Sequence, residues 1–134
     1  MIVADTNLIA YLLIEGDLTA LAEKVLQKDE IWISPLLWRS QFRNMLVKCA
    51  RGGLIEWDDA FRIMNEAESL MDGGEYAVVS GDVLDLAASS PCSAYDAEFV
   101  VLARELGVPL VTTEKSLLES FPETAVAPDK FARA

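Results

Sequence analysis

The chain has 134 residues, 52% of them hydrophobic, and a formal net charge of −11. This length and apolar content predict one globular domain and argue against a disordered chain. Histidine is absent, which excludes Ser-His-Asp and Cys-His catalysis, histidine-ligated metals and imidazole acid–base chemistry. The acidity argues against a broad nucleic-acid surface, although a bound cation can invert the potential of an acidic pocket.

The cysteines and the apolar runs bear on the compartment of the protein. Cys49 lies in a predicted helix and Cys92 in a loop-like Ser-Pro-Cys-Ser segment, so we expect two reduced thiols. Their number and spacing do not match a zinc site. No apolar run has the length of a membrane span, and none ends in a signal-peptide cleavage pattern, so we expect a cytoplasmic protein.

Strands and helices are expected to alternate along the first half of the chain. In order, the expected elements are a buried strand at 2–5, helices at 7–14 and 18–28, a strand at 31–33, and helices at 36–51 and 56–71. Pro35 is well placed as the first residue of a helix, where its missing N–H costs no hydrogen bond. Asp58 and Asp59 favour the first turn of the last of these helices.

The second half continues the alternation. In order, the expected elements are a strand at 76–79, a helix at 82–88, a loop at 89–93, a helix at 94–106 ended by Gly107, a strand at 108–113, a short helix at 114–120, a strand at 124–126 and a peripheral tail at 128–134. Strands that are apolar throughout and separated by helices predict a parallel sheet covered on both faces. The fold class is therefore α/β, in one domain.

Three acids fall where this sheet would bring them to one edge. Asp5 ends the first strand, and Glu114 directly follows the fourth. Asp96 lies near the start of the helix that crosses back to enter the fourth strand. Ligands of parallel α/β sheets bind beyond the carboxyl ends of the strands, so we expect the three carboxylates to converge there. A fourth polar residue, the amide Gln41, follows Trp38 on a predicted helix.

Clustered carboxylates favour a hard cation. Like charges raise each other's pKa unless a cation such as Mg²⁺ or Mn²⁺ neutralises them. Such an ion lowers the pKa of a bound water and stabilises charge on a phosphodiester under attack. The hydroxyls expected to support the ion or the phosphate are those of Ser93, Thr112 and Thr113.

Each of these residues also has a purely structural explanation. Asp5 is placed to cap the helix that follows it, and Asp96 and Glu114 are placed in first turns that favour a negative charge. Gln41 shares a helix face with Asn44 and Lys48, as a solvated residue would. From the pattern alone, both explanations stay open.

Four segments together resemble the PIN-domain family, and most closely the VapC-type ribonuclease toxins of bacterial toxin–antitoxin pairs. The segments are 2–7, 37–44, 93–99 and 110–114, in the order and spacing of that family. The resemblance implies a three-layer α/β/α domain over residues 1–134, with a mainly parallel sheet of four or five strands. It also implies a Mg²⁺- or Mn²⁺-dependent endoribonuclease that forms homodimers and is inhibited by a cognate antitoxin.

The resemblance assigns roles to residues and exposes two departures. The family's first and third acids fall on Asp5 and Asp96, with Asn7 as a supporting residue, and its fourth, usually Asp, falls on Glu114. The second, usually Glu, falls on Gln41. An amide can still offer an oxygen ligand, but the site loses one negative charge. Weaker metal binding and reduced activity are therefore expected.

The densest basic stretch of the chain is a candidate contact for RNA phosphates. Arg39, Arg43 and Lys48 lie on one predicted helix. Pairing with neighbouring acids is an equal alternative for them. Trp32, Trp38 and Trp57 could stack on bases, but packing in the core or in a dimer explains them better.

Two rival functions stay open. With Gln41 in place of an acid, the chain could be a weak or inactive PIN-like module that dimerises and binds an antitoxin. A phosphatase with Asp5 as its nucleophile ranks lower, because Asn7 stands where a second Asp is expected.

Overall fold

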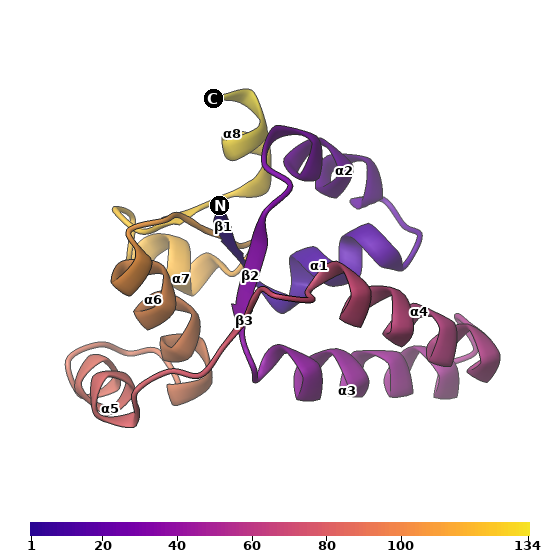
Figure 1. The fold of residues 1–134 in the computed structure, drawn as a ribbon, viewed down its shortest axis with the longest axis horizontal. Coiled ribbons are helices and arrows are strands. Elements are labelled where there is room, and N and C mark those ends of the chain that lie inside the picture. The colour runs from indigo at the N-terminus through magenta and orange to yellow at the C-terminus, as the bar shows by residue number, and fades with distance from the viewer.

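The computed structural model describes residues 1–134 and contains a five-stranded sheet with helices on both faces (Figure 1). In chain order, its elements are β1 (Ile2–Ala4), α1 (Thr6–Leu13), α2 (Thr19–Lys28), β2 (Trp32–Pro35), α3 (Trp38–Arg51), α4 (Trp57–Leu70), β3 (Glu75–Tyr76), α5 (Ser80–Ala88), α6 (Ala94–Leu106), β4 (Leu110–Val111), α7 (Lys115–Ser120), β5 (Ala125–Val126) and α8 (Pro128–Arg133). No helix is long and apolar enough to cross a membrane.

The sheet has the order β3-β2-β1-β4-β5, and every neighbouring pair is parallel. Val3 of β1 pairs with Ile33 of β2 on one side and with Leu110 of β4 on the other. Because all five strands run in one direction, their carboxyl ends lie along one edge. The predicted parallel sheet with helices on both faces is confirmed.

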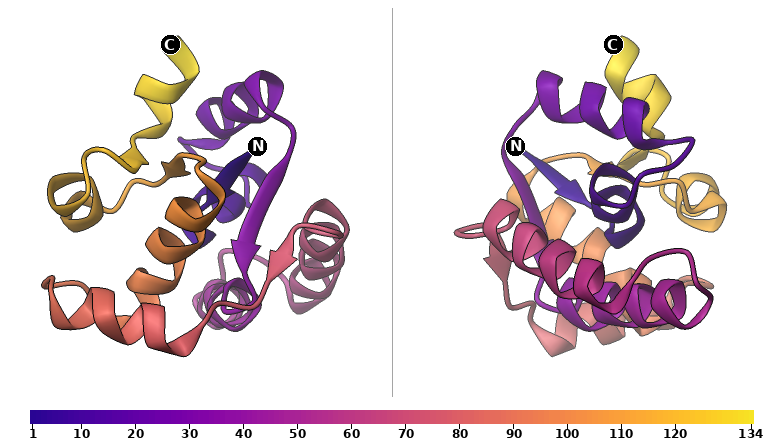
Figure 2. Two further views of the ribbon diagram at one scale, coloured as in Figure 1. Left: turned by 60° about the vertical axis from the view of Figure 1, so that its left-hand side comes forward. Right: turned by 90° about the vertical axis from the view of Figure 1, so that its right-hand side faces the viewer.

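The core has two halves, one on each face of the sheet. Side chains alternate along a strand, so Ile2 and Ala4 of β1 pack against α1, α3 and α4, whereas Val3 packs against α6 and α7. Figure 2 shows α3 and α4 running side by side on the first face, with α6 across the sheet from them. Burying a side chain such as Ile2 stabilises the fold by about 1.5–3 kcal/mol. The core thereby fixes the strand ends that carry the polar residues.

The expectation for Pro35 is wrong. Pro35 belongs to β2, where it pairs with Tyr76 of β3, and α3 begins only at Trp38. The N–H groups on either side of it, those of Ser34 and Leu36, donate to β3. Alternate residues of a strand point their N–H groups to the same neighbour, so the ring nitrogen of Pro35 faces away from that ladder.

The paired parts of the later strands are shorter than predicted. The run 76–79 pairs only over Glu75–Tyr76, and the run 108–113 only over Leu110–Val111. β3 is an edge strand with one neighbour, and the chain leaves it to reach α5. Gly74 lies against the carbonyl of Trp32, a contact that any Cβ would obstruct. The glycine therefore lets β3 approach β2.

The cap of α6 matches the prediction from the sequence, whereas the C-terminal segment does not. Gly107 caps α6 with a positive φ of 66°, as predicted. The predicted peripheral tail forms α8 instead, which packs beside α2: Phe131 contacts the core, and Lys28 Nζ donates to its carbonyl. Both cysteines are free thiols, as expected.

Candidate active site

A cavity of about 250 Å³ lies at the edge of the sheet where β1 and β4 end. It is lined mostly by polar side chains from separate elements: Asp5, Thr6, Asn7, Gln41, Asn44, Met45, Asp96 and Glu114. All three acids singled out in the sequence therefore meet at one place, together with the amide. The crossover topology brings them there, since Asp5 follows β1, Glu114 follows β4 and Asp96 lies in the first turn of α6.

Asp5 is the most buried of the acids, with 7% of its surface exposed. Thr112 Oγ1 donates a 2.6 Å hydrogen bond to Asp5 Oδ2. Burial raises the pKa of Asp5 from 3.8 to about 6, the Thr112 hydrogen bond lowers it, and the charge of Glu114 adds to the rise. Loss of solvation therefore outweighs the hydrogen bond. A cation would lower this cost.

Asp96 and Glu114 interact across the cavity. Burial raises the pKa of Asp96, and the charge of Glu114 raises it further. Glu114 Oε1 accepts a 3.1 Å hydrogen bond from Asn7 Nδ2, while its backbone N–H donates to Thr112 Oγ1 at 3.0 Å. Asn7 and Thr112 thus hold the acids in place.

Capping hydrogen bonds do not account for Asp5 or Glu114, whereas Asp96 does lie in the first turn of α6, as its structural explanation requires. Asp5 and Glu114 occupy the cap positions of α1 and α7, but neither side chain makes a capping hydrogen bond. The cap of α6 is Ser93, whose Oγ accepts from the N–H of Asp96 at 3.1 Å. Ser93 therefore orients the first turn of α6 and does not line the cavity. Thr113 is exposed, and its hydroxyl contacts that of Tyr11 at 3.0 Å.

Gln41 lies near the start of α3 and points into the same cavity. Its Oε1 accepts a 2.6 Å hydrogen bond from Thr6 Oγ1. Asn44, three residues further along, also lines the cavity, because residues three apart share a helix face. One wall of the cavity is therefore built of neutral amides from α3, and the acids come from the other elements.

The donor set suits a hard cation, but the carboxylates are not drawn together into a compact cluster. No group of three or more His, Cys, Asp or Glu side chains has the spacing to hold a metal ion. Carboxylate and amide oxygens are the ligands that Mg²⁺ and Mn²⁺ prefer. Burial and the charge of Glu114 raise the pKa values of Asp5 and Asp96, and a bound cation would act in the opposite direction. By chemistry, the residues fit such an ion.

Solved structures with this fold are known. PAE2754 from Pyrobaculum aerophilum superposes with a TM-score of 0.78 at 22% identity, over 98% of this chain and 87% of that one. The structure of FitAcB from Neisseria gonorrhoeae gives a TM-score of 0.72 at 14% identity, over 96% of this chain and 98% of that one. At these identities the likeness concerns the fold alone. No family model matches the sequence.

A sequence relative decides the family. Ribonuclease VapC3 of Pyrobaculum aerophilum is 30% identical over 124 residues, which are 90% of this chain and 95% of the relative. The chain belongs to the VapC family of PIN-domain proteins. In this VapC-family protein, the four positions picked out by the family resemblance all line one cavity: Asp5, Gln41, Asp96 and Glu114.

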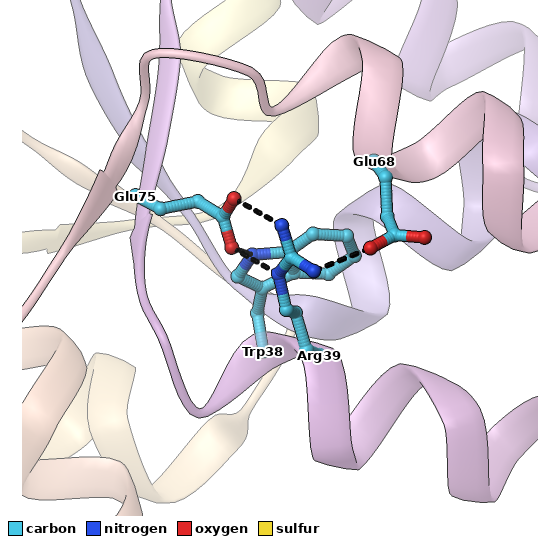
Figure 3. A network of polar contacts seen from close by, with 4 residues as sticks. All are labelled: Trp38, Arg39, Glu68 and Glu75. Atoms are coloured by element: carbon cyan, nitrogen blue, oxygen red, sulfur yellow. Dashed lines mark hydrogen bonds and ion pairs between the residues drawn. The ribbon is translucent and has the colours of Figure 1, made fainter.

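Arg39 of this VapC-family protein is held in a network of polar contacts (Figure 3). Its Nη2 donates to Glu75 Oε1 at 2.7 Å, its Nε pairs with Glu75 Oε2, and its Nη1 pairs with Glu68. Trp38 Nε1 donates to the same Glu75 carboxylate at 2.9 Å. The hydrogen bonds from Arg39 lower the pKa of Glu75. These contacts tie α3 to α4 and β3, which fits the pairing alternative for Arg39.

The other two basic candidates differ from Arg39. Arg43 and Lys48 are exposed, and neither forms an ion pair. Arg43 lies beside an apolar groove between α3 and α4. Trp32 and Trp38 are buried in the core, as expected, and Trp57 is half exposed at that groove.

Three lining residues of this PIN domain were not among the predicted site residues. Thr6 directly follows Asp5 and carries a hydroxyl that suits a helix start, and Asn44 shares a helix face with Gln41. Met45 has an apolar side chain, which gives no indication of a polar site. For Asn44, the spacing of three from Gln41 could have placed it in the site; for Met45, nothing in the sequence could.

Proposed function

We propose that this chain is an endoribonuclease of the VapC type, which hydrolyses RNA phosphodiesters with the help of a Mg²⁺ or Mn²⁺ ion. The convergence of Asp5, Asp96 and Glu114 on one cavity carries this proposal. The name of the 30% identical relative, Ribonuclease VapC3, supports it. The family's second acid is replaced by Gln41.

Asp5, Asp96 and Glu114 would hold the ion, which supplies Lewis-acid activation of a water and neutralises charge on the phosphodiester. Hydrolysis then forms a bond from a water oxygen to phosphorus and breaks one P–O ester bond of the RNA. Thr112 keeps the Asp5 carboxylate oriented, and Asn7 does the same for Glu114.

Activity is proposed to be lower than that of a form with an acid at position 41. Gln41 brings no negative charge, so the site attracts a cation less strongly than four carboxylates would. The same observation favours the second candidate function, a weakly active module that binds its partners. An aspartyl phosphatase is disfavoured, because Asp5 is buried and its Oδ2 is engaged by Thr112.

A cognate antitoxin and a second copy of the chain are the proposed protein partners, in the cytoplasm. Two apolar grooves offer surfaces for them: one lies between α3 and α4, beside the exposed Trp57 and Phe61, and the other between β3 and α5, beside Leu36 and Leu84. The net charge of −11 suits a basic antitoxin. Light scattering of the purified chain, alone and with the antitoxin, measures both associations.

Cleavage of single-stranded RNA in Mg²⁺ or Mn²⁺, compared with cleavage in chelator, tests the proposed activity. Asp96→Asn, purified in the same way, controls for contaminating nuclease. We expect cleavage that chelator abolishes and that Asp96→Asn reduces at least about a hundredfold. Cleavage that survives both changes would overturn the carboxylate site. Absence of cleavage by the wild type, with cleavage by Gln41→Glu, would favour the binding module.

A further inference from the structure

The side-chain amide of Gln41 is turned with its oxygen toward the protein. An amide has an acceptor end and a donor end, and Oε1 accepts the hydroxyl of Thr6 at 2.6 Å. The Nε2 group has no hydrogen-bond partner in the protein. Because no buried side-chain nitrogen or oxygen lacks a partner, Nε2 is open to solvent at the cavity that Gln41 lines. The donor end is therefore the end of this amide left available to a ligand in the cavity.

A donor at this place favours an anion over a cation. Nε2 carries two N–H bonds, and its lone pair is delocalised into the carbonyl, so it is a poor metal ligand and instead favours negatively charged oxygen. Side-chain amides are common partners of phosphate oxygens in nucleic-acid complexes. Asn44, on the same wall, adds a second amide without a formal charge. The wall from α3 thus faces the three acids with side chains that carry no formal charge.

We infer that Gln41 is a phosphate-binding residue of this chain, whose Nε2 donates to a non-bridging oxygen of the RNA backbone, and not a ligand of the cation. The inference rests on the proposed ribonuclease function and concerns the same cavity. Thr6 is the positioning residue, since its hydroxyl donates to the amide oxygen and so fixes which end of the amide is engaged within the protein. The amide at position 41 then has two effects. It attracts a cation less strongly than an acid would, and it adds a direct contact to the substrate.

The test measures RNA binding and cation binding separately, so that neither depends on turnover. Fluorescence anisotropy with a labelled single-stranded RNA, in chelator and at low salt, gives the RNA affinity of the full chain. Calorimetric titration of Mn²⁺ without RNA gives the cation affinity. The variant is Gln41→Met, which keeps length and helix propensity but removes both amide groups. Its matched control is Gln27→Met, an exposed amide on α2; α2 lies at the top of Figure 1, whereas α3 lies at the bottom.

Gln41→Met is expected to weaken RNA binding about tenfold, as loss of one hydrogen bond to a charged group does, and to leave Mn²⁺ affinity within about twofold. Gln27→Met should change neither. Thr6→Val, which frees the amide to rotate, should weaken RNA binding without weakening Mn²⁺ binding. Melting temperatures identify variants that fold.

Three results would overturn the inference. Loss of Mn²⁺ affinity in Gln41→Met comparable to that in Asp96→Asn would make Gln41 a cation ligand. Unchanged RNA affinity in both Gln41→Met and Thr6→Val would remove its role toward phosphate. Both results leave the ribonuclease proposal standing. If the wild type binds no RNA in either chelator or Mn²⁺, the ribonuclease proposal fails, and this inference fails with it.

Discussion

The hydroxyl of Thr112 donates a 2.6 Å hydrogen bond to Oδ2 of Asp5, and both side chains are buried. The same hydroxyl accepts the backbone N–H of Glu114 at 3.0 Å. Burial raises the pKa of Asp5 and this hydrogen bond lowers it. One side chain therefore positions two of the three acids and favours the ionised form of the more buried one.

Thr112→Val removes this hydroxyl and keeps the shape of the side chain. We expect the pKa of Asp5 to rise further, because the hydrogen bond that lowers it is lost. The free energy of unfolding should fall by about 1–3 kcal/mol at about pH 8, where the carboxylate is ionised and buried without its donor. Urea denaturation near pH 8 and near pH 4.5 measures the difference. Thr112→Ser should behave like the wild type, and an equal loss at both pH values would contradict the role in stabilising the charge.

The pKa of Asp5 predicts a pH dependence of stability. Its value of about 6 in the fold exceeds the ordinary 3.8, so the folded chain holds the proton more tightly than the unfolded chain. The contribution of Asp5 to the free energy of unfolding is fully present below about pH 4. It is lost as the pH rises through 6, which lowers the free energy of unfolding by up to about 3 kcal/mol. Asp5→Asn, which resembles the protonated form, should be the more stable protein above about pH 7 when both are free of metal.

Urea unfolding of wild type and Asp5→Asn across this range measures the effect. Asp85→Asn, an exposed acid on α5, is the control and should track the wild type. The shift of Asp96 has the same sign and adds to the slope. Curves for wild type and Asp5→Asn that stay parallel through pH 6 would show that Asp5 titrates with an ordinary pKa.

The sheet and the site residues were predictable for different reasons. Strands without polar positions could only be buried on both faces, so β1 and β4 follow from composition, and the parallel order follows from the helices between them. The convergence of Asp5 and Glu114 follows from that topology. The length of β3 could not be predicted, because the apolar run 76–79 does not reveal that its strand has one neighbour.

Side-chain partners were the least predictable feature. Arg39 and Arg43 have the same residue type and lie one turn apart, yet only Arg39 meets acids, from positions 68 and 75. Those acids are distant in sequence, and no spacing along α3 indicates them. Likewise, no sequence spacing links Thr6 to Gln41, whereas in the fold the Thr6 hydroxyl donates to the Gln41 side chain.

Gln41→Glu should strengthen metal binding and activity. The added carboxylate gives the cavity a fourth negative charge, so Mn²⁺ affinity should rise on the order of tenfold, and RNA cleavage in Mn²⁺ should rise with it. Cleavage rates of both purified proteins across Mn²⁺ concentrations measure the change. Gln27→Glu adds the same charge on α2 and should have no such effect. Equal metal-dependent rates for wild type and Gln41→Glu would refute the prediction.

Substitutions of Arg39 and Arg43 are expected to have different effects, one on stability and the other on RNA binding. Arg39→Gln breaks the pairs with Glu68 and Glu75, so it should lower the melting temperature and affect RNA affinity no more than a surface substitution. Arg43→Gln removes an exposed, unpaired charge of α3, beside the apolar groove between α3 and α4. It should leave the melting temperature within about 1 °C and weaken RNA binding more at low salt than at high salt. Thermal melts and RNA anisotropy at two salt concentrations measure both effects. If Arg39→Gln weakens RNA binding and Arg43→Gln does not, Arg39 belongs to the RNA-binding surface.

Calorimetric titration of Mn²⁺ into the metal-free chain tests most directly whether Asp5, Asp96 and Glu114 form a cation site. We predict saturable binding that Asp96→Asn weakens at least about tenfold and that Asp85→Asn leaves unchanged. Near pH 6, in buffers of different ionisation enthalpy, binding should release protons, because Asp5 has a pKa of about 6 and must ionise to bind. No binding by the wild type, or equal binding by Asp96→Asn, would contradict a metal-dependent site at these acids.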